Sequence, residues 1–134
     1  MSLLQVEQFW LINLNPTQTT YIMDATFVEL PPFERHRAQY FNDEEFRGFR
    51  RLLLKQPDAG AVIQGTGGLR RYALPIRPGS KRGGLRVIYY HWVQGNHFWL
   101  FAVYGKDVQE DLNAEQKKVL RHMLNTELRA RTTS

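Results

Sequence analysis

The chain has 134 residues, a formal net charge of +5 and no cysteine, which excludes disulfides, thiolate catalysis and zinc sites built from cysteine. The positive charge favours an anionic partner: nucleic acid, an acidic protein or an anionic membrane surface. No apolar run approaches the roughly 20 residues of a membrane-spanning helix, so we expect one soluble domain in a reducing cytoplasm.

The N-terminal segment, residues 1–22, differs in composition from the rest of the chain, and Met23 stands directly before the first strand-like run. We predict that this segment is a loosely attached arm, or lies upstream of the folded domain, because tolerance to such additions concentrates at termini. The folded domain is then expected to span residues 23–130.

The domain is predicted to begin with a strand and a short helix. The run ATFVEL at residues 25–30 is rich in strand formers, and Pro31-Pro32 ends it because proline donates no backbone hydrogen bond. Residues 33–40 favour a short helix.

A longer helix is predicted to start after Asn42, which is followed by three acids that suit the positive end of a helix dipole. Phe46, Phe49 and Leu53 recur at helical spacing, and Gln56-Pro57 ends the pattern. We interpret this stripe as core.

The stretch from Asp58 to Gly68 is a glycine-rich connection. It lacks the lysine and spacing of a P-loop and the third glycine of a dinucleotide fingerprint, so its glycines are interpreted as turn or bulge residues. Residues 69–74 predict a second strand in which Arg70 and Tyr72 share a face.

A basic loop at residues 75–83 leads into an alternating strand at 85–92, with Arg86, Ile88, Tyr90 and Trp92 on one face. Residues 97–104 are almost wholly apolar, which predicts a central strand that forms an antiparallel hairpin with 85–92. The end of such a hairpin lies beside its start, so Lys106 is expected to lie near Arg86 unless a register slip or bulge intervenes.

The last element is a helix from about Asn113, which forms a start resembling a capping box with Gln116. Its positive residues are interpreted as a solvated face. The predicted apolar stripe consists of Val119, Leu120, Met123, Leu124 and Leu128.

Charge is segregated along the chain. Between Asp58 and Asp107 there is no acidic residue, and a field of this kind attracts phosphates. The cations within this gap are Arg70, Arg71, Arg77, Lys81, Arg82, Arg86 and Lys106.

Several motifs in matching order, from about Thr26 to Leu128, resemble the RelE/ParE superfamily of bacterial toxins, and within it most closely the HigB branch. These motifs are FVE, DEEFR, VIQGTGGLRR, KRGGLRVIYY, VYGKD and DLNAEQKKVL. The resemblance implies a small α+β domain, in which N-terminal helices and a C-terminal helix pack on a twisted, mainly antiparallel four-stranded sheet.

The resemblance also implies a function: an endonuclease that cuts mRNA in the ribosomal A site, in contact with ribosomal RNA. Its expected inhibitor is an acidic, HigA-like helix-turn-helix antitoxin encoded beside it. Two alternatives stay open, a ParE-like inhibitor of DNA gyrase and a non-catalytic RNA-binding module.

RNA can be cleaved by attack of its own 2′-hydroxyl on the adjacent phosphate, so an enzyme needs to orient the backbone, move protons and stabilise negative charge. Cations suffice for this chemistry, and we expect no metal or cofactor. By resemblance, Arg86 occupies the family's arginine after the paired glycines and Lys106 its basic residue after the fourth strand. Arg70 is the third catalytic candidate, a second arginine fork for phosphate.

RNA binding is assigned to Arg71, Arg77, Lys81, Arg82 and, because it shares the face of Arg86, Tyr90. Related toxins often read Lys-Asn where this chain has Lys106-Asp107, and a tyrosine of some relatives is replaced by Asp111-Leu112. An acid beside Lys106 holds it charged, although Asp107 could itself accept the proton. The identity of the general acid and base stays open.

Overall fold

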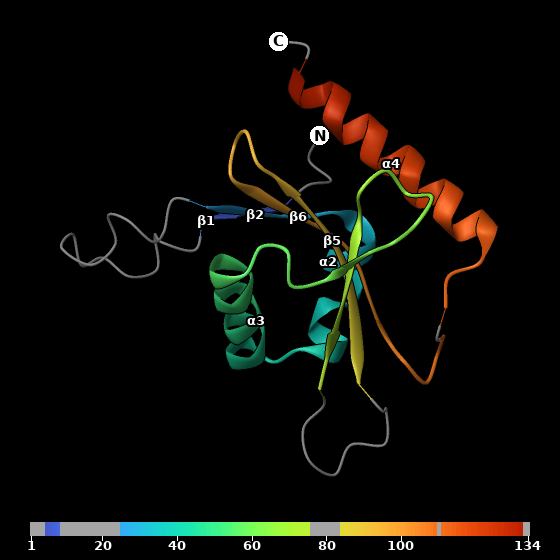
Figure 1. The fold of residues 1–134 in the computed structure, drawn as a ribbon. Helices are drawn as coiled ribbons and strands as arrows, with labels where there is room; N and C mark the ends of the chain where they lie inside the picture. Colours follow the sequence, from blue (N-terminus) through green and yellow to red (C-terminus); the bar gives the residue numbers. More distant parts are fainter. Residues whose placement is uncertain (1–4, 9–24, 76–83, 110, 133–134) are drawn as a thin grey trace, which may run out of the picture.

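The computed structural model describes residues 5–8, 25–75, 84–109 and 111–132 (Figure 1). The described strands form one six-stranded sheet in the order β1-β2-β6-β5-β4-β3. The elements are β1 Gln5–Gln8, β2 Thr26–Glu29, α2 Pro31–Tyr40, α3 Asp43–Lys55, β3 Ala61–Val62, β4 Arg70–Leu74, β5 Leu85–Trp92, β6 His97–Gly105 and α4 Ala114–Thr132.

The α+β class is confirmed, but the prediction of four strands was wrong. The four predicted strands correspond to β2, β4, β5 and β6, and the described residues add β1 and β3 at the two edges. Pairing is antiparallel except between β2 and β6, which run parallel. At four and two residues, the edge strands are too short to give a periodic signal in the sequence.

The strand β1 falls within the segment that we expected outside the folded domain. It pairs with β2 in antiparallel register, with Val6 opposite Val28. The other edge of β2 is taken by β6, so β1 completes the backbone pairing of β2. Apart from these four residues, the predicted arm lies outside the part of the chain that the structure describes.

The helix starts follow the predicted chemistry. The helix α2 begins at Pro31 rather than at residue 33, because proline is tolerated in the first turn, where its missing N–H has no partner to lose. At α3, the Asn42 side chain accepts a hydrogen bond from the Glu45 N–H (2.7 Å), and the Glu45 carboxylate accepts one from the Asn42 N–H (2.9 Å). The predicted capping residue is thus confirmed.

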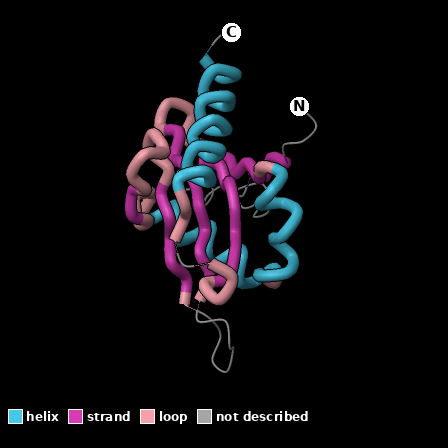
Figure 2. The backbone as a smooth tube through the Cα atoms, turned by 90° about the vertical axis from the view of Figure 1, so that its right-hand side faces the viewer, coloured by secondary structure: helices cyan, strands magenta, loops and turns pink. Residues whose placement is uncertain are grey.

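Two apolar clusters lie on opposite sides of the sheet, and helices stand on both sides (Figure 2). We call one side the α3 face, where residues such as Val87 and Phe98 pack against Phe46 and Phe49. We call the other the α4 face, where the strand residues Val28, Ile88, Trp99 and Phe101 pack with Leu120 and Leu124. The predicted core stripe of the longer helix is confirmed by the burial of Phe46, Phe49 and Leu53.

A bulge in β6 decides which of its side chains reach the α4 face. Ile88 pairs with Ala102, but Tyr89 pairs with Leu100, so Phe101 is an extra residue in β6. Phe101 and Ala102 both belong to the α4-face cluster. Strict alternation from Trp99 would put Tyr104 on the other side, and the extra residue returns it to the α4 face.

The C-terminal helix α4 starts at a capping box, as predicted. The Asn113 side chain accepts from the Gln116 N–H (2.8 Å), and the Gln116 carboxamide oxygen accepts from the Asn113 N–H (3.0 Å). Leu120 and Leu124 are buried, but Val119 is 56% exposed and lies at the margin of the predicted stripe. No helix of the described residues is both long and apolar enough to cross a membrane.

Candidate functional site

Arg86 lies near the start of β5, between Ala73 of β4 and Tyr104 of β6. It is half-buried on the α4 face, and its Nη1 donates a hydrogen bond to the carbonyl oxygen of Leu85 (3.1 Å). A Cβ placed on Gly84 would lie 3.2 Å from the same Nη1. The guanidinium therefore folds back toward the end of the sheet where the β5–β6 hairpin opens.

Lys106 lies at that same end. Its N–H donates to the carbonyl oxygen of Gly84 (3.0 Å), which continues the pairing of Leu85 with Gly105 by one residue, and its side chain is exposed. The prediction that the end of the second hairpin strand lies beside the start of the first is confirmed. Gly84 has a φ of +120°, which glycine adopts readily, so the turn into β5 depends on this residue.

Tyr104 is the side chain that the sequence interpretation overlooked. The register places it directly opposite Arg86 on the α4 face. Its hydroxyl is buried and has no hydrogen-bond partner among the described residues, which costs about 1–3 kcal/mol for a fully desolvated group. The signal that could have found it is cross-strand pairing in the predicted hairpin, but only with the bulge at Phe101 included.

Arg71 joins the same face through β4, where it pairs with Ile88. Its Nη1 lies 3.7 Å from the Asp111 carboxylate, whose side chain is 83% exposed, so the pair adds little stability. Sequence analysis placed Arg71 among the RNA-binding residues, and its face is compatible with that assignment.

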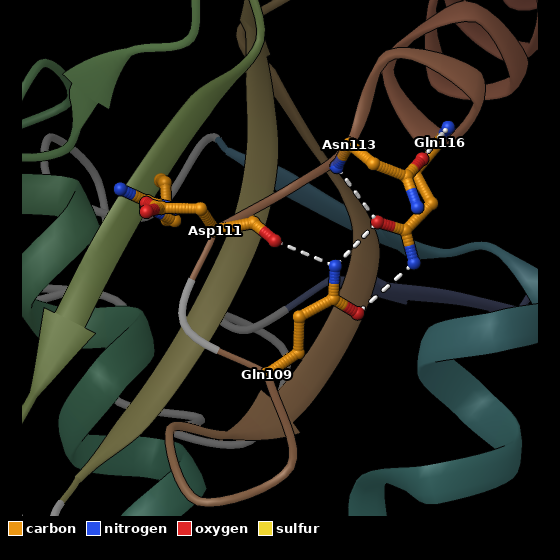
Figure 3. Close-up of polar contacts among 5 residues, drawn as sticks. Gln109, Asp111, Asn113 and Gln116 are labelled. Carbon is orange, nitrogen blue, oxygen red and sulfur yellow. Dashed lines mark hydrogen bonds and ion pairs between the residues drawn. The ribbon is translucent and has the colours of Figure 1, made fainter.

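A carboxamide network fixes the connection that carries Asp111 (Figure 3). Gln109 Nε2 donates to the Asp111 carbonyl oxygen (2.6 Å) and to Gln116 Oε1, while Gln116 Nε2 donates back to Gln109 Oε1 (2.9 Å). Because Gln116 Oε1 also accepts from the Asn113 N–H, the β6–α4 connection is tied to the first turn of α4. The network thereby sets the position of the acid that faces Arg71.

Arg70 was predicted to clamp phosphate with Arg86, but the structure does not bring the two together. Arg70 pairs with Tyr89, whose side chain is in the α3-face cluster, so its side chain leaves the sheet on the side opposite Arg86. Its Nη1 donates to the carbonyl oxygens of Gly60 (2.8 Å) and Asp58 (3.4 Å).

The loop that Arg70 holds is also fixed by Tyr89. The buried Tyr89 hydroxyl donates to the Pro57 carbonyl oxygen (2.8 Å) and accepts from the Gly60 N–H (2.9 Å). Burial raises the pKa of Tyr89, while the hydrogen bond from Gly60 and the charge of Arg70 act against that rise. These contacts give Arg70 a structural role. The sequence predicted that Arg70 and Arg71 point to opposite faces of the strand, but it did not tell which of the two faces carries Arg86.

Asp107 was a candidate proton acceptor, and it too lies away from Arg86. A Cβ on Gly105 would meet the Asp107 carboxylate and approach the Tyr40 ring (3.6 Å). Gly105 pairs with Leu85, an α3-face residue, so the carboxylate lies on the α3 side of the hairpin end.

Tyr90 shares the α4 face with Arg86, as predicted, but at four residues' distance along the strand, about 13 Å. Its ring packs on Trp99 with centroids 5.4 Å apart, so it forms part of the packing beneath α4. Arg77, Lys81 and Arg82 lie outside the described residues.

The histidines of β5 and β6 have structural surroundings. His91 stacks on Phe98 with ring centroids 4.5 Å apart and shares a hydrogen bond with the Asn96 side chain (3.1 Å). Burial, helped by the charge of Arg131, lowers the pKa of His97. In the part of the chain that the structure describes, no group of three or more histidine and acidic residues could hold a metal ion.

The arrangement that remains is a cationic corner, which we define as Arg71, Arg86 and Lys106 with Tyr104. Arg86, Lys106 and Tyr104 lie at the end where the β5–β6 hairpin opens, and Arg71 lies two residue pairs further along β4 on the same face. Arginine forks and a lysine ammonium there can bind an oxyanion and stabilise charge that builds up on it. No protein-family model matches the chain.

Proposed function

We propose that this protein is an endoribonuclease, the toxin of a type II toxin–antitoxin system, which cuts mRNA in the ribosomal A site. The observation that carries the proposal is the position of Arg86 and Lys106 at one end of a single hairpin, where the Lys106 N–H binds the Gly84 carbonyl oxygen (3.0 Å). The acid-free stretch of the sequence supplies the surrounding positive field.

The chemistry assigned to the cationic corner is cleavage by the 2′-hydroxyl of the RNA itself. This hydroxyl attacks the adjacent phosphorus and the 5′-oxygen of the next nucleotide leaves, which yields a 2′,3′-cyclic phosphate and a 5′-hydroxyl. The arginine fork of Arg86 binds the nonbridging oxygens as their negative charge grows, and Lys106 adds a second cation. One well-placed donor of this kind contributes roughly 100- to 1,000-fold in rate.

The proposed partners match the charge of the same surface. Ribosomal RNA and mRNA are polyanions, and their negative charge complements the net charge of +5. An acidic, HigA-like antitoxin, which would hold the toxin inactive, complements the same charge. A cytoplasmic location suits both.

The test is primer extension on mRNA from cells that express the wild type, Arg86→Ala or Lys106→Ala. Arg121→Ala and Lys118→Ala are matched controls, because both cations are exposed on α4. We expect discrete cuts that require translation, that are lost in the first two variants and that persist in the controls. Supercoiling defects without cuts would instead support a ParE-like gyrase inhibitor.

A non-catalytic RNA-binding module is the second candidate, and one observation favours it. Asp107 and Arg70, two of the groups expected to take part in catalysis, lie on the other side of the sheet from Arg86. The register instead places Tyr104, whose hydroxyl carries a proton, beside Arg86. RNA binding that Arg86→Ala weakens, without cuts by the wild type on translating ribosomes, would establish this second candidate.

A further inference from the structure

A mainly apolar cavity of about 400 Å³ opens between the first turns of α4 and the α4 face of the sheet. Ile88, Ala102 and Tyr104 line it from the strands, and Val119, Leu120 and Met123 line it from the helix. The polar groups in its lining come from Gln109, Gln116, Glu115 and, on α2, His36. The proposed cleavage chemistry leaves this cavity without a role.

The cavity adjoins the cationic corner through Tyr104, and through Ile88, which pairs with Arg71. Tyr104 lines the cavity and is also the cross-strand neighbour of Arg86. Directly opposed residues of an antiparallel pair have Cα atoms about 4.5–5.5 Å apart, so a group in the cavity lies about one side chain away from an oxyanion bound at Arg86. A ligand that joins an anionic part to a flat apolar part matches both features.

The size of the cavity and the chemistry of its walls narrow the class of ligand further. Cavities of about 300–1,000 Å³ with apolar walls and a few polar groups are typical of sites for small organic groups, and a single aromatic heterocycle fits within 400 Å³. The apolar walls can cover the ring, while the carboxamides and Glu115 can meet hydrogen-bonding groups at its edge. The positive corner next to it complements the phosphate that such a ring carries in RNA.

We propose that this cavity binds one nucleobase of the RNA substrate, the base of a nucleotide that flanks the phosphate held at Arg86. This inference rests on the proposed function, because it takes the cationic corner as the phosphate site. It assigns to the helix α4 a share in substrate binding: its N-terminal half forms one wall of the base pocket.

A ligand series tests the pocket directly. The probe is a short single-stranded RNA with 2′-O-methyl groups, which block cleavage, and a set of versions in which one base at a time is removed. Methyl resonances of Val119, Leu120 and Met123 and the backbone amides around Arg86 are followed by NMR. We expect the intact RNA to shift both groups of signals, and one abasic version to shift only the signals around Arg86.

A pair of matched substitutions tests the pocket in activity. Val119→Trp fills the mouth of the cavity from a position that is 56% exposed, so the fold tolerates it; Val93→Trp makes the same change at a 71% exposed valine in the β5–β6 turn. We expect Val119→Trp to weaken RNA binding and cleavage about tenfold or more, the scale of one lost base contact, and Val93→Trp to match the wild type.

The outcomes separate the two proposals. Wild-type cleavage that Arg86→Ala abolishes and Val119→Trp leaves intact overturns the base pocket while the nuclease stands. The base pocket is also overturned if every abasic version shifts the methyl signals of the pocket equally. The same holds if these signals respond to an apolar acidic peptide but not to RNA. A wild type that neither binds nor cuts RNA refutes the nuclease, and the base pocket with it.

Discussion

Replacing Arg70 by methionine should lower stability and leave the chemistry untouched. The change keeps an unbranched stem but removes the charge-assisted hydrogen bond from Nη1 to the part-buried Gly60 carbonyl (2.8 Å) and the weaker, exposed one to Asp58 (3.4 Å). Hydrogen bonds to charged groups are worth about 1.5–3 kcal/mol, and the partial exposure of Arg70 reduces this to about 1–2 kcal/mol. For a domain of this size, that is a fall in Tm of roughly 5 °C.

Urea and thermal denaturation measure the loss, with Arg51→Met as the control, since Arg51 is an exposed arginine on α3 and its replacement should change stability by less than about 0.5 kcal/mol. Tyr89→Phe removes the other group that holds the same loop, so the double variant should show non-additive losses. Unchanged stability with loss of RNA cleavage in Arg70→Met would refute the reasoning, because it would place Arg70 at the reacting phosphate.

Three further changes have expected outcomes. Burial raises the pKa of Glu29, and the hydrogen bond from Arg37 opposes this rise. The stability that the protonated carboxyl contributes is therefore fully present below pH 4.5 and is lost as pH rises through the raised pKa. Glu29→Gln should gain stability relative to the wild type as pH rises above 4.5, and urea titrations showing a constant gap would contradict this. Gly84→Ala should cost about 1–3 kcal/mol in chemical denaturation because φ is +120° and the added Cβ lies 3.0 Å from the Leu74 carbonyl oxygen; wild-type stability would count against it. Asp111→Asn removes the acid 3.7 Å from Arg71, so RNA should bind more tightly with a steeper salt dependence while stability changes by less than about 1 kcal/mol; weaker binding in salt titrations would be the opposite result.

Local chemistry made much of the fold predictable. The capping residues Asn42 and Asn113 mark their helices, and the alternation of residues 85–92 gives β5 with its observed bounds. The short edge strands β1 and β3 carry no such signal, and the parallel pairing of β2 with β6 joins segments about 70 residues apart that no local pattern relates.

The site was predictable only where the hairpin alone determines it. Lys106 lies at the end of β6 and Arg86 near the start of β5, so their segments meet whatever the neighbouring strands do. Whether Arg70 or Arg71 shares the face of Arg86 depends on the register of β4 on β5, which alternation in each strand does not fix. The place of Tyr104 depends on one extra residue, Phe101, and a bulge leaves no clear mark in an apolar run.

The most direct test of the central claim is the single-turnover cleavage rate of mRNA on programmed ribosomes by the wild type, Arg86→Ala, Lys106→Ala and the double variant. If both cations act on one phosphate, each single change should slow cleavage about 100-fold or more. The double variant should then cleave only a little more slowly than the slower of the two single variants. Single variants that cut at the wild-type rate, or losses that simply multiply in the double variant, would contradict a shared active centre at this end of the hairpin.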